Sequence, residues 1–366
     1  MKIIKVQVFP LDSVPIQQHV QEHGLVRIDT DEGISGWGSC FMPPYLVEAS
    51  LRYLEERLVG QDPTQVEKVS ETLHQWSYWF GRGGAITVFI SGVDIALWDI
   101  MGKAAGKSVG RLLGGRYREK MKPYASLLFS LPVDKMVKDL ESARARGFRA
   151  FKLGWAPFGR IDAKTDELLV KTARQAIGDD CDLMVDAGGS DAYWPNDLKW
   201  AINTSHMLKD YNVTWFEEAL YDRDLEGFKK LRQVSPVWIA TGECLRKRQD
   251  FYPWIFERAV DVLQPDLTAM GGISDGRRLA WMANDYGILV VCHGWNTAIG
   301  LAADLQLSAS LSQARWVEYM TPTPYIDRIL VEPFKLDSDG YLPIPDTPGL
   351  GVEVDVDAVK KLAAKR

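Results

Sequence analysis

The stretch from DLMVDAG (residues 182–188) to TWFEEAL (residues 214–220) decides the fold of this chain. Both quoted runs are short and apolar and carry acids near their ends, and the segment between them has the apolar spacing of a helix. Short apolar runs bounded by turn residues are typical of buried strands. Because parallel strands need a crossover connection, this strand–helix–strand pattern predicts a parallel sheet.

The same pattern continues on both sides of that stretch. It predicts eight strands, at residues 124–130, 150–155, 182–188, 214–220, 237–245, 260–267, 288–295 and 315–320. A helical segment lies between successive strands, and eight such units predict a (β/α)8-type barrel. The fold class is therefore α/β.

A smaller α+β unit is predicted ahead of the barrel. Strand-like alternation is found at residues 2–9, 25–29 and 34–37. Helical spacing then runs from about residue 45 to 106 and includes a long apolar helix over 85–102. After residue 321 the chain becomes rich in proline and glycine and ends in a short helical tail, 356–366. The domains expected are an α+β capping unit, the barrel and a C-terminal segment, at residues 1–122, 123–325 and 326–366.

Composition excludes several classes of protein. The 366 residues are 46% hydrophobic and 25% charged, which is ordinary for a globular chain. The net charge of −6 is not gathered in blocks, so neither a nucleic-acid groove nor a membrane-binding patch is expected. We expect no apolar run long enough to span a bilayer. The N-terminus lacks signal-peptide features and the four cysteines are dispersed, which predicts a cytoplasmic protein without a disulfide framework.

Polar side chains capable of chemistry fall at the C-terminal ends of the predicted strands from the second onward. They are Lys152, Asp186, Glu217 with Glu218, Glu243, Asp266, His293 and Glu318. Strand C-termini form the catalytic face of such barrels, so these side chains could share one cavity. The alternative without a catalytic function is a structural barrel whose acids are helix caps and loop salt bridges. That alternative requires every one of these positions to be coincidental.

Three acids on neighbouring strands, Asp186, Glu217 and Glu243, would repel each other in one cavity. A divalent cation would remove this repulsion, and an all-oxygen ligand set favours a hard ion such as Mg²⁺, with Mn²⁺ as the alternative. Adjacent residues of a strand face opposite sides, so we expect only one of Glu217 and Glu218 to be a ligand.

Nine stretches, taken in order, resemble the mandelate racemase subgroup of the enolase superfamily. They are ISGVDIALWDIMGKAAGKSVGRLLGG (90–115), GFRAFKLGW (147–155), MVDAGG (184–189), WFEEAL (215–220), TGECL (241–245), LQPDLTAMGGIS (263–274), CHGWN (292–296), RWVEYM (315–320) and IPDTPGLGVEVD (344–355). The resemblance implies a modified TIM barrel, (β/α)7β, with an N-terminal α+β capping domain to which the C-terminal segment returns. It also implies a homo-oligomer.

The resemblance assigns roles to individual residues. Asp186, Glu217 and Glu243 match the three Mg²⁺ ligands of the family, and Asp266 and His293 match its Asp–His dyad. Glu318 matches an acid that hydrogen-bonds the substrate, and Lys152 matches a lysine that contacts the substrate carboxylate. Members of the family abstract a proton α to a carboxylate and form an enediolate. The partner expected is therefore a small-molecule carboxylate.

Departures from the family pattern reduce the number of reactions that this chain is expected to catalyse. The second strand of many members carries Lys-x-Lys, and the second lysine, a base, is replaced here by Gly154. The third-strand Asn is replaced by Gly188, and the Pro that usually follows the two glutamates is Ala219. Inversion of a stereocentre needs a base on each face, whereas one base suffices for β-elimination. The chain therefore resembles an acid sugar dehydratase, a lyase in which His293 serves as base and then as acid.

Other functions stay open at this point. A lactone cycloisomerase needs the same enolate and one base, and a racemase or epimerase would need a second base. A catalytically silent sugar-acid binder gives no reason for Asp266, His293 and Glu318 to share one face of a barrel. The residues expected to bind substrate, from their positions in loops, are His19, Tyr45, Arg82, Trp155 and Trp295.

Overall fold

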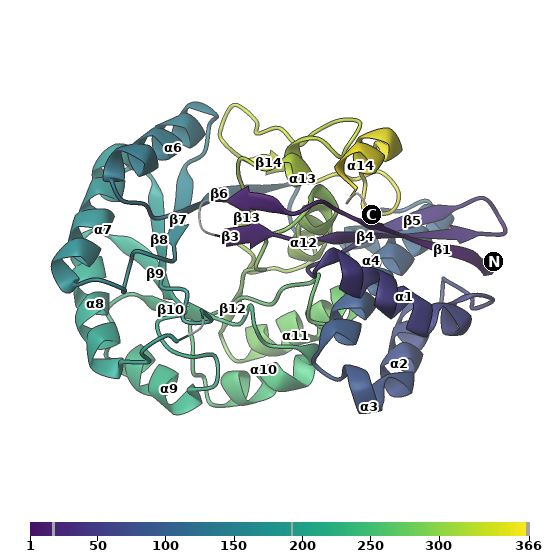
Figure 1. Cartoon of the computed structure of the whole chain (residues 1–366), viewed down its shortest axis with the longest axis horizontal. Helices are drawn as coiled ribbons and strands as arrows, with labels where there is room; N and C mark the ends of the chain where they lie inside the picture. Colours follow the sequence, from purple (N-terminus) through teal and green to yellow (C-terminus); the bar gives the residue numbers. More distant parts are fainter. Residues whose placement is uncertain (17–18, 192, 364–366) are drawn as a thin grey trace.

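The computed structural model describes residues 1–16, 19–191 and 193–363, and it contains the predicted barrel (Figure 1). The parallel strands are β6 (Lys120–Leu128), β7 (Ala150–Gly154), β8 (Asp182–Asp186), β9 (Val213–Glu217), β10 (Trp238–Thr241), β11 (Val262–Leu263), β12 (Leu289–Val290) and β13 (Trp316–Met320). The helices after the first seven are α6 (Val133–Ala145), α7 (Ala163–Ile177), α8 (Leu198–Asp210), α9 (Leu225–Val234), α10 (Lys247–Phe256), α11 (Gly272–Asp285) and α12 (Ala298–Ala309). This order is (β/α)7β, so the fold prediction is confirmed.

The hydrogen-bonded order of the sheet runs from β12 through β11 to β6 and ends at β13. The ladders of β11 and β12 are two residues long, shorter than the apolar runs that predicted them. Single backbone hydrogen bonds continue beyond these ladders, from Gln264 N to Thr241 O and from Val291 N to Leu263 O. Short, irregular strand ends leave room for side chains to turn into the mouth of the barrel.

One apolar layer fills the barrel and includes a residue from every strand. Its members are Tyr124, Ala150, Met184, Trp215, Ala240, Val262, Leu289, Val291 and Trp316. The Trp215 ring meets those of Tyr124 and Trp316 edge to face, each with centroids 5.5 Å apart. Such packing excludes water from the barrel interior and makes a floor beneath the C-terminal ends of the strands.

The capping unit consists of an antiparallel sheet covered by helices. The sheet contains β1 (Ile3–Pro10), β4 (Gly24–Thr30) and β5 (Ser35–Cys40), in the order β1-β4-β5. The helices are α1 (Pro44–Leu58), α2 (Val66–Trp76), α3 (Tyr78–Gly81), α4 (Ala85–Ala105) and α5 (Val109–Leu112). A Cβ at Gly38 of β5 would lie 1.8 Å from the Gly92 carbonyl oxygen, so glycine is what lets α4 pack directly on the sheet.

Helix α4 corrects one expectation from the sequence. Its 21 residues are long and apolar enough to cross a membrane by length and composition, but most of them are buried inside the protein. Two buried acids explain how it is held there. Asp94 accepts hydrogen bonds from Ser70 of α2 and Ser274 of α11, and Asp99 accepts from the backbone N–H groups of Trp37 and Leu350. This helix is therefore a core element that joins cap, barrel and C-terminal segment.

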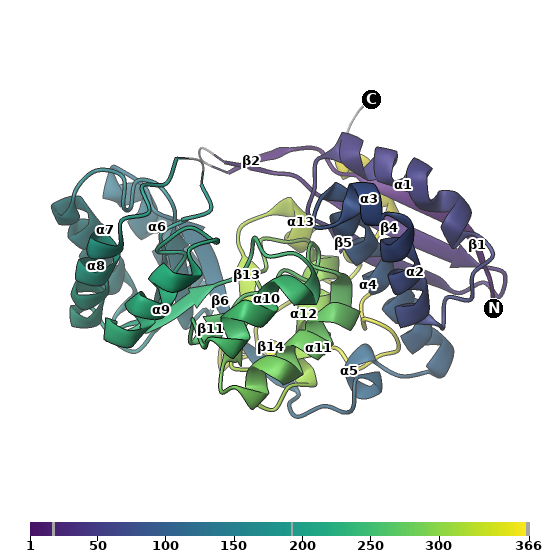
Figure 2. The same cartoon turned by 90° about the horizontal axis from the view of Figure 1, so that it is seen from below.

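A small hairpin reaches from the cap over the barrel mouth (Figure 2). It consists of β2 (Val14–Ile16) and β3 (His19–Gln21). Buried Gln21 ties it to the barrel, because its amide donates to the Asn296 carbonyl at 3.2 Å and accepts from the Thr323 hydroxyl at 2.8 Å. The hairpin thereby covers the side of the mouth formed by the segments after β12 and β13.

The C-terminal segment contacts both units. It includes α13 (Pro324–Asp327), β14 (Leu342–Pro343), which pairs antiparallel with β6, and α14 (Val356–Leu362). Single bridges join Gly349 to Ser108 and Ala363 to Leu11 in the cap. The domain boundaries at 122/123 and 325/326 stay predictions, and the end of the predicted tail helix, 364–366, lies outside the described residues.

Candidate active site

The barrel floor explains where the polar side chains point. Successive side chains of a strand alternate between its two faces, so the residue two positions after a floor residue also faces inward. Lys152 follows Ala150 in this way, and so do Asp186, Glu217, His293 and Glu318 after other floor residues. Glu243 and Asp266 do not, because they lie beyond the ends of β10 and β11. The structure thus brings together, in the mouth of the barrel, the polar residues named from the sequence: Lys152, Asp186, Glu217, Glu243, Asp266, His293 and Glu318.

Asp186, Glu217 and Glu243 form a carboxylate cluster. One oxygen atom from each lies within 4.8 Å of the other two. Burial, and then repulsion from Glu217, raise the pKa of Asp186 well above its usual value. Two buried acids and one partly buried acid, all with oxygen donors, fit a hard divalent cation such as Mg²⁺, which would let all of them stay ionised.

Lys152 lies against this cluster. Its Nζ is 2.7 Å from Glu217 Oε1, 3.0 Å from Glu318 Oε1 and 3.9 Å from Asp186 Oδ2. Burial alone would lower the pKa of Lys152, but attraction to Glu217 and Glu318 outweighs it and holds the pKa well above the usual value. Lys152 is therefore a fixed positive charge, suited to hold an anion rather than to accept a proton.

His293 and Asp266 form the predicted dyad. His293 Nδ1 is 2.9 Å from Asp266 Oδ2, and Asp266 Oδ1 accepts from the backbone N–H and hydroxyl of Thr268. Both carboxylate oxygens of Asp266 thus have hydrogen-bond partners, and the aspartate holds the imidazole in one orientation. The His293 Nε2 faces the carboxylate cluster, 3.3 Å from Glu243 Oε2. Burial opposes the charge on His293, yet Glu243, Asp266 and Glu318 raise its pKa well above the usual value.

Glu318 stays ionised beside the dyad. Its Oε2 accepts from the Gly294 backbone N–H at 2.7 Å. Burial would raise the pKa of Glu318, but the charges of Lys152 and His293 outweigh burial and lower the pKa to about 2. A glutamate in this state can accept hydrogen bonds from substrate hydroxyl groups but cannot donate one.

Gly154 and Gly188 stand where the resemblance expects further polar side chains, and neighbouring side chains fill the space at both positions. A Cβ at Gly154 would lie 2.8 Å from the Asp186 Cβ, and a Cβ at Gly188 would lie 2.8 Å from the Trp155 ring. Gly188 also has a φ of +63°, which favours glycine. Neither position has room for a base, and the Trp155 indole packs against the second.

A cavity of about 290 Å³ adjoins the charged cluster on the side of β6 and β13. Its lining includes Ser126, Trp295 and Thr321, and the cap hairpin contributes Val14. Most of the remaining wall is apolar, with side chains such as Leu128 and Met320. This cavity can hold the part of a substrate that lies away from the reacting carbon.

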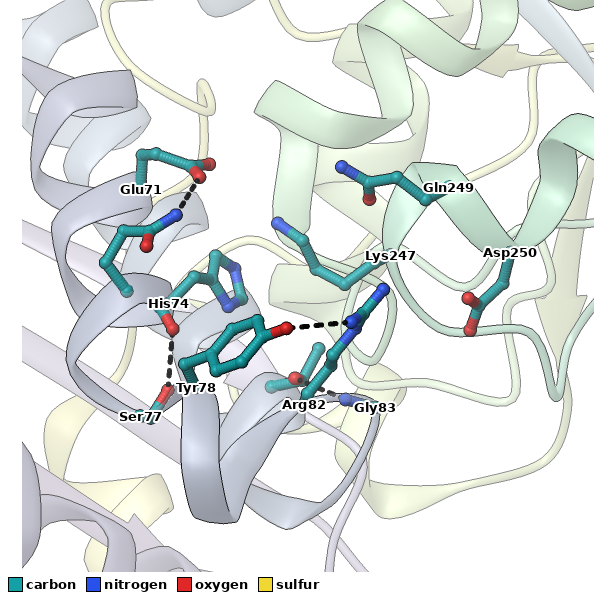
Figure 3. A pocket seen from close by; sticks show the side chains of 11 residues that line it. Glu71, His74, Ser77, Tyr78, Arg82, Gly83, Lys247, Gln249 and Asp250 are labelled. Carbon is teal, nitrogen blue, oxygen red and sulfur yellow. Dashed lines mark hydrogen bonds between the residues drawn. The ribbon is translucent and has the colours of Figure 1, made fainter.

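The five residues predicted to bind substrate are not brought together. Trp155 and Trp295 lie at the barrel mouth, whereas Tyr45 is 70% exposed on α1. Arg82 lines a different cavity, of about 370 Å³, between the α2–α3 region and α10, where it contacts the Tyr78 hydroxyl (Figure 3). The side chain of His19 lies outside the described residues.

Sequence reasoning missed two features. Ser126 belongs to the mouth, and its place two residues after Tyr124 on β6 was the available signal. The second missed feature is the position of Glu218. Strand β9 ends at Glu217, and Glu218 has a φ of +47°, so its buried side chain lies near Glu243. Of the two glutamates only Glu217 belongs to the cluster with Asp186, and the expectation that only one of them is a ligand stays a prediction.

Comparisons with known proteins agree with this architecture. Residues 3–114 match the model of the mandelate racemase / muconate lactonizing enzyme N-terminal domain, and residues 135–359 match the enolase C-terminal domain-like model. The D-galactarolactone cycloisomerase of Agrobacterium fabrum is 34% identical over 363 residues, which cover 96% of this chain and 93% of the relative. The D-galactonate dehydratase of Variovorax paradoxus is 32% identical over 347 residues, covering 91% and 89%.

Solved structures show the same likeness over the whole chain. The 3,6-anhydro-D-galactonate cycloisomerase from Zobellia galactanivorans has a TM-score of 0.91 at 29% identity, with 100% of both chains covered. A racemase from Streptomyces coelicolor with bound magnesium has a TM-score of 0.88 at 28% identity, covering 99% of this chain and 100% of that one. This chain therefore belongs to the mandelate racemase / muconate lactonizing enzyme family of the enolase superfamily.

Proposed function

We propose that this protein is a hydro-lyase that dehydrates a sugar acid to a 2-keto-3-deoxy acid. The observation that carries the proposal is the His293–Asp266 dyad at the barrel mouth, facing a second strand on which Gly154 leaves no room for another base. One base supports abstraction of an α-proton followed by β-elimination, whereas inversion of a stereocentre needs a proton donor on the opposite face.

Lys152 and Glu318 would orient the substrate. The positive charge of Lys152 attracts the carboxylate, and Glu318 accepts a hydrogen bond from a hydroxyl group. Mg²⁺ held by Asp186, Glu217 and Glu243 would stabilise negative charge on the substrate carboxylate. It would also weaken the attraction between Glu243 and the His293 proton. The family contains magnesium-bound members, and Mn²⁺ satisfies the same ligands.

His293 then performs both proton transfers. Its Nε2 takes the α-proton, and the electron pair of the broken C–H bond forms the enediolate. Asp266 stabilises the imidazolium through Nδ1–H. His293 next returns the proton to the β-hydroxyl group, which leaves as water while the C–O bond breaks. The resulting enol tautomerises to the 2-keto acid.

Ring-opening by a lactone cycloisomerase is the second candidate. It uses the same base and the same enediolate, but the leaving group is a ring oxygen that stays attached to the product. The largely apolar wall of the 290 Å³ cavity favours this candidate, because a cyclic sugar acid presents fewer free hydroxyl groups than an open chain. The cycloisomerases among the relatives point the same way.

The test is to incubate the protein and Mg²⁺ with aldonic, aldaric and uronic acids and their lactones, and to assay 2-keto acid as the semicarbazone. We expect a product that EDTA abolishes and that His293→Asn reduces by about 10²–10⁴-fold, the usual worth of a general base. His206→Asn, an exposed histidine on α8, is the matched control.

Each outcome decides between the candidates. Near-wild-type turnover by His293→Asn would refute the role of His293. Proton NMR in deuterated water separates the reactions by their products. Dehydration gives a product that has lost water, whereas ring-opening gives a product with the same composition as the substrate. Racemisation leaves deuterium in the recovered substrate. A cytoplasmic location and a homo-oligomer stay predictions of this proposal.

A further inference from the structure

Glu218 is a buried acid that the proposed reaction does not use. Its side chain is 1% exposed, and its left-handed backbone is held by hydrogen bonds from Glu218 N to Ala240 O and from Gly189 N to Glu218 O. The carboxylate accepts from the backbone N–H and the hydroxyl of Ser190 through Oε2. Its other oxygen, Oε1, is buried without a hydrogen-bond partner in the described part of the chain.

A thiol lies near the Glu218 carboxylate. Single ligand atoms of Glu218, Glu243 and Cys244 lie within 4.8 Å of one another. These residues form a second group, which shares only Glu243 with the cluster of Asp186, Glu217 and Glu243. A carboxylate has two oxygens, so one glutamate can contribute to two neighbouring cation sites.

Charge also favours a cation here. Lys152 pairs with Glu217 and Glu318, and His293 pairs with Glu243 and Asp266. Among the ion pairs of the described residues, Glu218 has no cationic partner of its own. A buried carboxylate that is neither paired with a cation nor fully hydrogen-bonded is destabilising, and a bound cation would remove this cost.

The group is accessible from solvent. Cys244 and Ser190 line a cavity of about 370 Å³, to which Asp191 and Asp222 also contribute. Arg223 lines the same cavity, and the two acids are paired with arginines, Asp191 with Arg160 and Asp222 with Arg223. A cation can thus reach Cys244 through this cavity.

We propose that Glu218, Glu243 and Cys244 form a second divalent-cation site, beside the Mg²⁺ cluster, that takes a thiophilic ion such as Zn²⁺ or Co²⁺. The thiolate sets the selectivity, because sulfur ligands favour these ions over Mg²⁺. Binding releases the thiol proton to solvent and forms the metal–sulfur bond without any redox change. The bound ion would neutralise Glu218 and fix the orientation of Glu243.

The test is Co²⁺ binding to protein saturated with Mg²⁺. A thiolate bound to Co²⁺ produces a charge-transfer absorption band in the near ultraviolet, which oxygen ligands do not produce. We expect this band in the wild type and its loss in Cys244→Ser, with Cys181→Ser, on the far side of the barrel, as the matched control. Equilibrium dialysis should then find one fewer bound Co²⁺ in Cys244→Ser.

A second variant distinguishes loss of the metal site from misfolding of the protein. Glu218→Gln keeps the shape of the side chain, and we expect its Co²⁺ affinity to fall by about tenfold or more. Its thermal midpoint in Mg²⁺ alone should not fall, because the neutral amide removes an unpaired buried charge. Saturating Co²⁺ without a charge-transfer band, or a band that persists in Cys244→Ser, would overturn the proposal. Neither result depends on the dehydratase activity, so the two proposals fail separately.

Discussion

Gly154 lies on β7 directly beside the metal cluster, paired in the ladder with Asp186. Its lack of a side chain has two consequences. It removes the base that the resemblance expects there, and it lets the Asp186 side chain occupy the space where a Cβ would lie. The same glycine on which we base the one-base proposal therefore also affects the position of a candidate ligand.

We predict that Gly154→Ala weakens Mg²⁺ binding. The new Cβ would lie 2.8 Å from the Asp186 Cβ, so the aspartate must shift away from Glu217 and Glu243. The expected loss is about tenfold or more in Mg²⁺ affinity, measured by isothermal titration calorimetry. Gly84→Ala, where the nearest atom to a Cβ is 4.0 Å away, is the control. Equal affinities for the two variants would contradict the proposed ligand role of Asp186.

At the scale of elements, α4 shows how one helix can join three parts of a chain. The carboxylate of Asp94 contacts α2 and α11, and that of Asp99 contacts β5 and the C-terminal segment. Burial, only partly offset by hydrogen bonds from Ser274 and Ser70, raises the pKa of Asp94 to about 7. Asp94 is therefore protonated in the folded protein at a pH where it is ionised in the unfolded chain.

This difference predicts a pH-dependent stability. Between the unfolded pKa of 3.8 and the folded value of about 7, the folded state binds the extra proton, so the free energy of unfolding falls as the pH rises. The loss attributable to Asp94 is at most about 4 kcal/mol. We expect Asp94→Asn, which mimics the protonated acid, to flatten the dependence between pH 4 and 7 in urea unfolding. Asp285→Asn, at an exposed position, should retain it, and an identical slope in both variants would refute the assignment.

At the scale of the whole molecule, the cap and the barrel build the site together. The barrel supplies the charged cluster, and the cap hairpin supplies Val14 to the cavity next to it. Gln21 is the buried side chain that links the hairpin to the loops after β12 and β13. The wall of this cavity thus depends on contacts between segments far apart in the sequence.

We predict that Gln21→Ala loosens the hairpin from the barrel. Three buried hydrogen bonds are lost, to Asn296, Thr323 and the His23 ring, at about 1–3 kcal/mol for each partner left unsatisfied. Amide hydrogen exchange should become faster in β3, and KM should rise more than kcat falls, because the dyad itself is untouched. Gln75→Ala on α2, whose amide bonds Glu71, is the control. Unchanged exchange in β3 would show that other contacts hold the hairpin.

The amino-acid sequence by itself determined a (β/α)8-type barrel, a capping unit and the set of polar residues at the barrel mouth. It could do so because strand alternation and the spacing of strand–helix units are local properties, and they place the polar residues at strand ends. The family resemblance changed the expected barrel to (β/α)7β and added roles to those positions.

Only the tertiary structure decided the rest. The left-handed turn that brings Glu218 beside Cys244, the ion pairs that fix the charge of Lys152, the burial of α4 and the separation of Arg82 from the site all arise from contacts between distant segments. Backbone torsion at a strand end and the neighbours of a side chain are set by packing, which local periodicity does not encode.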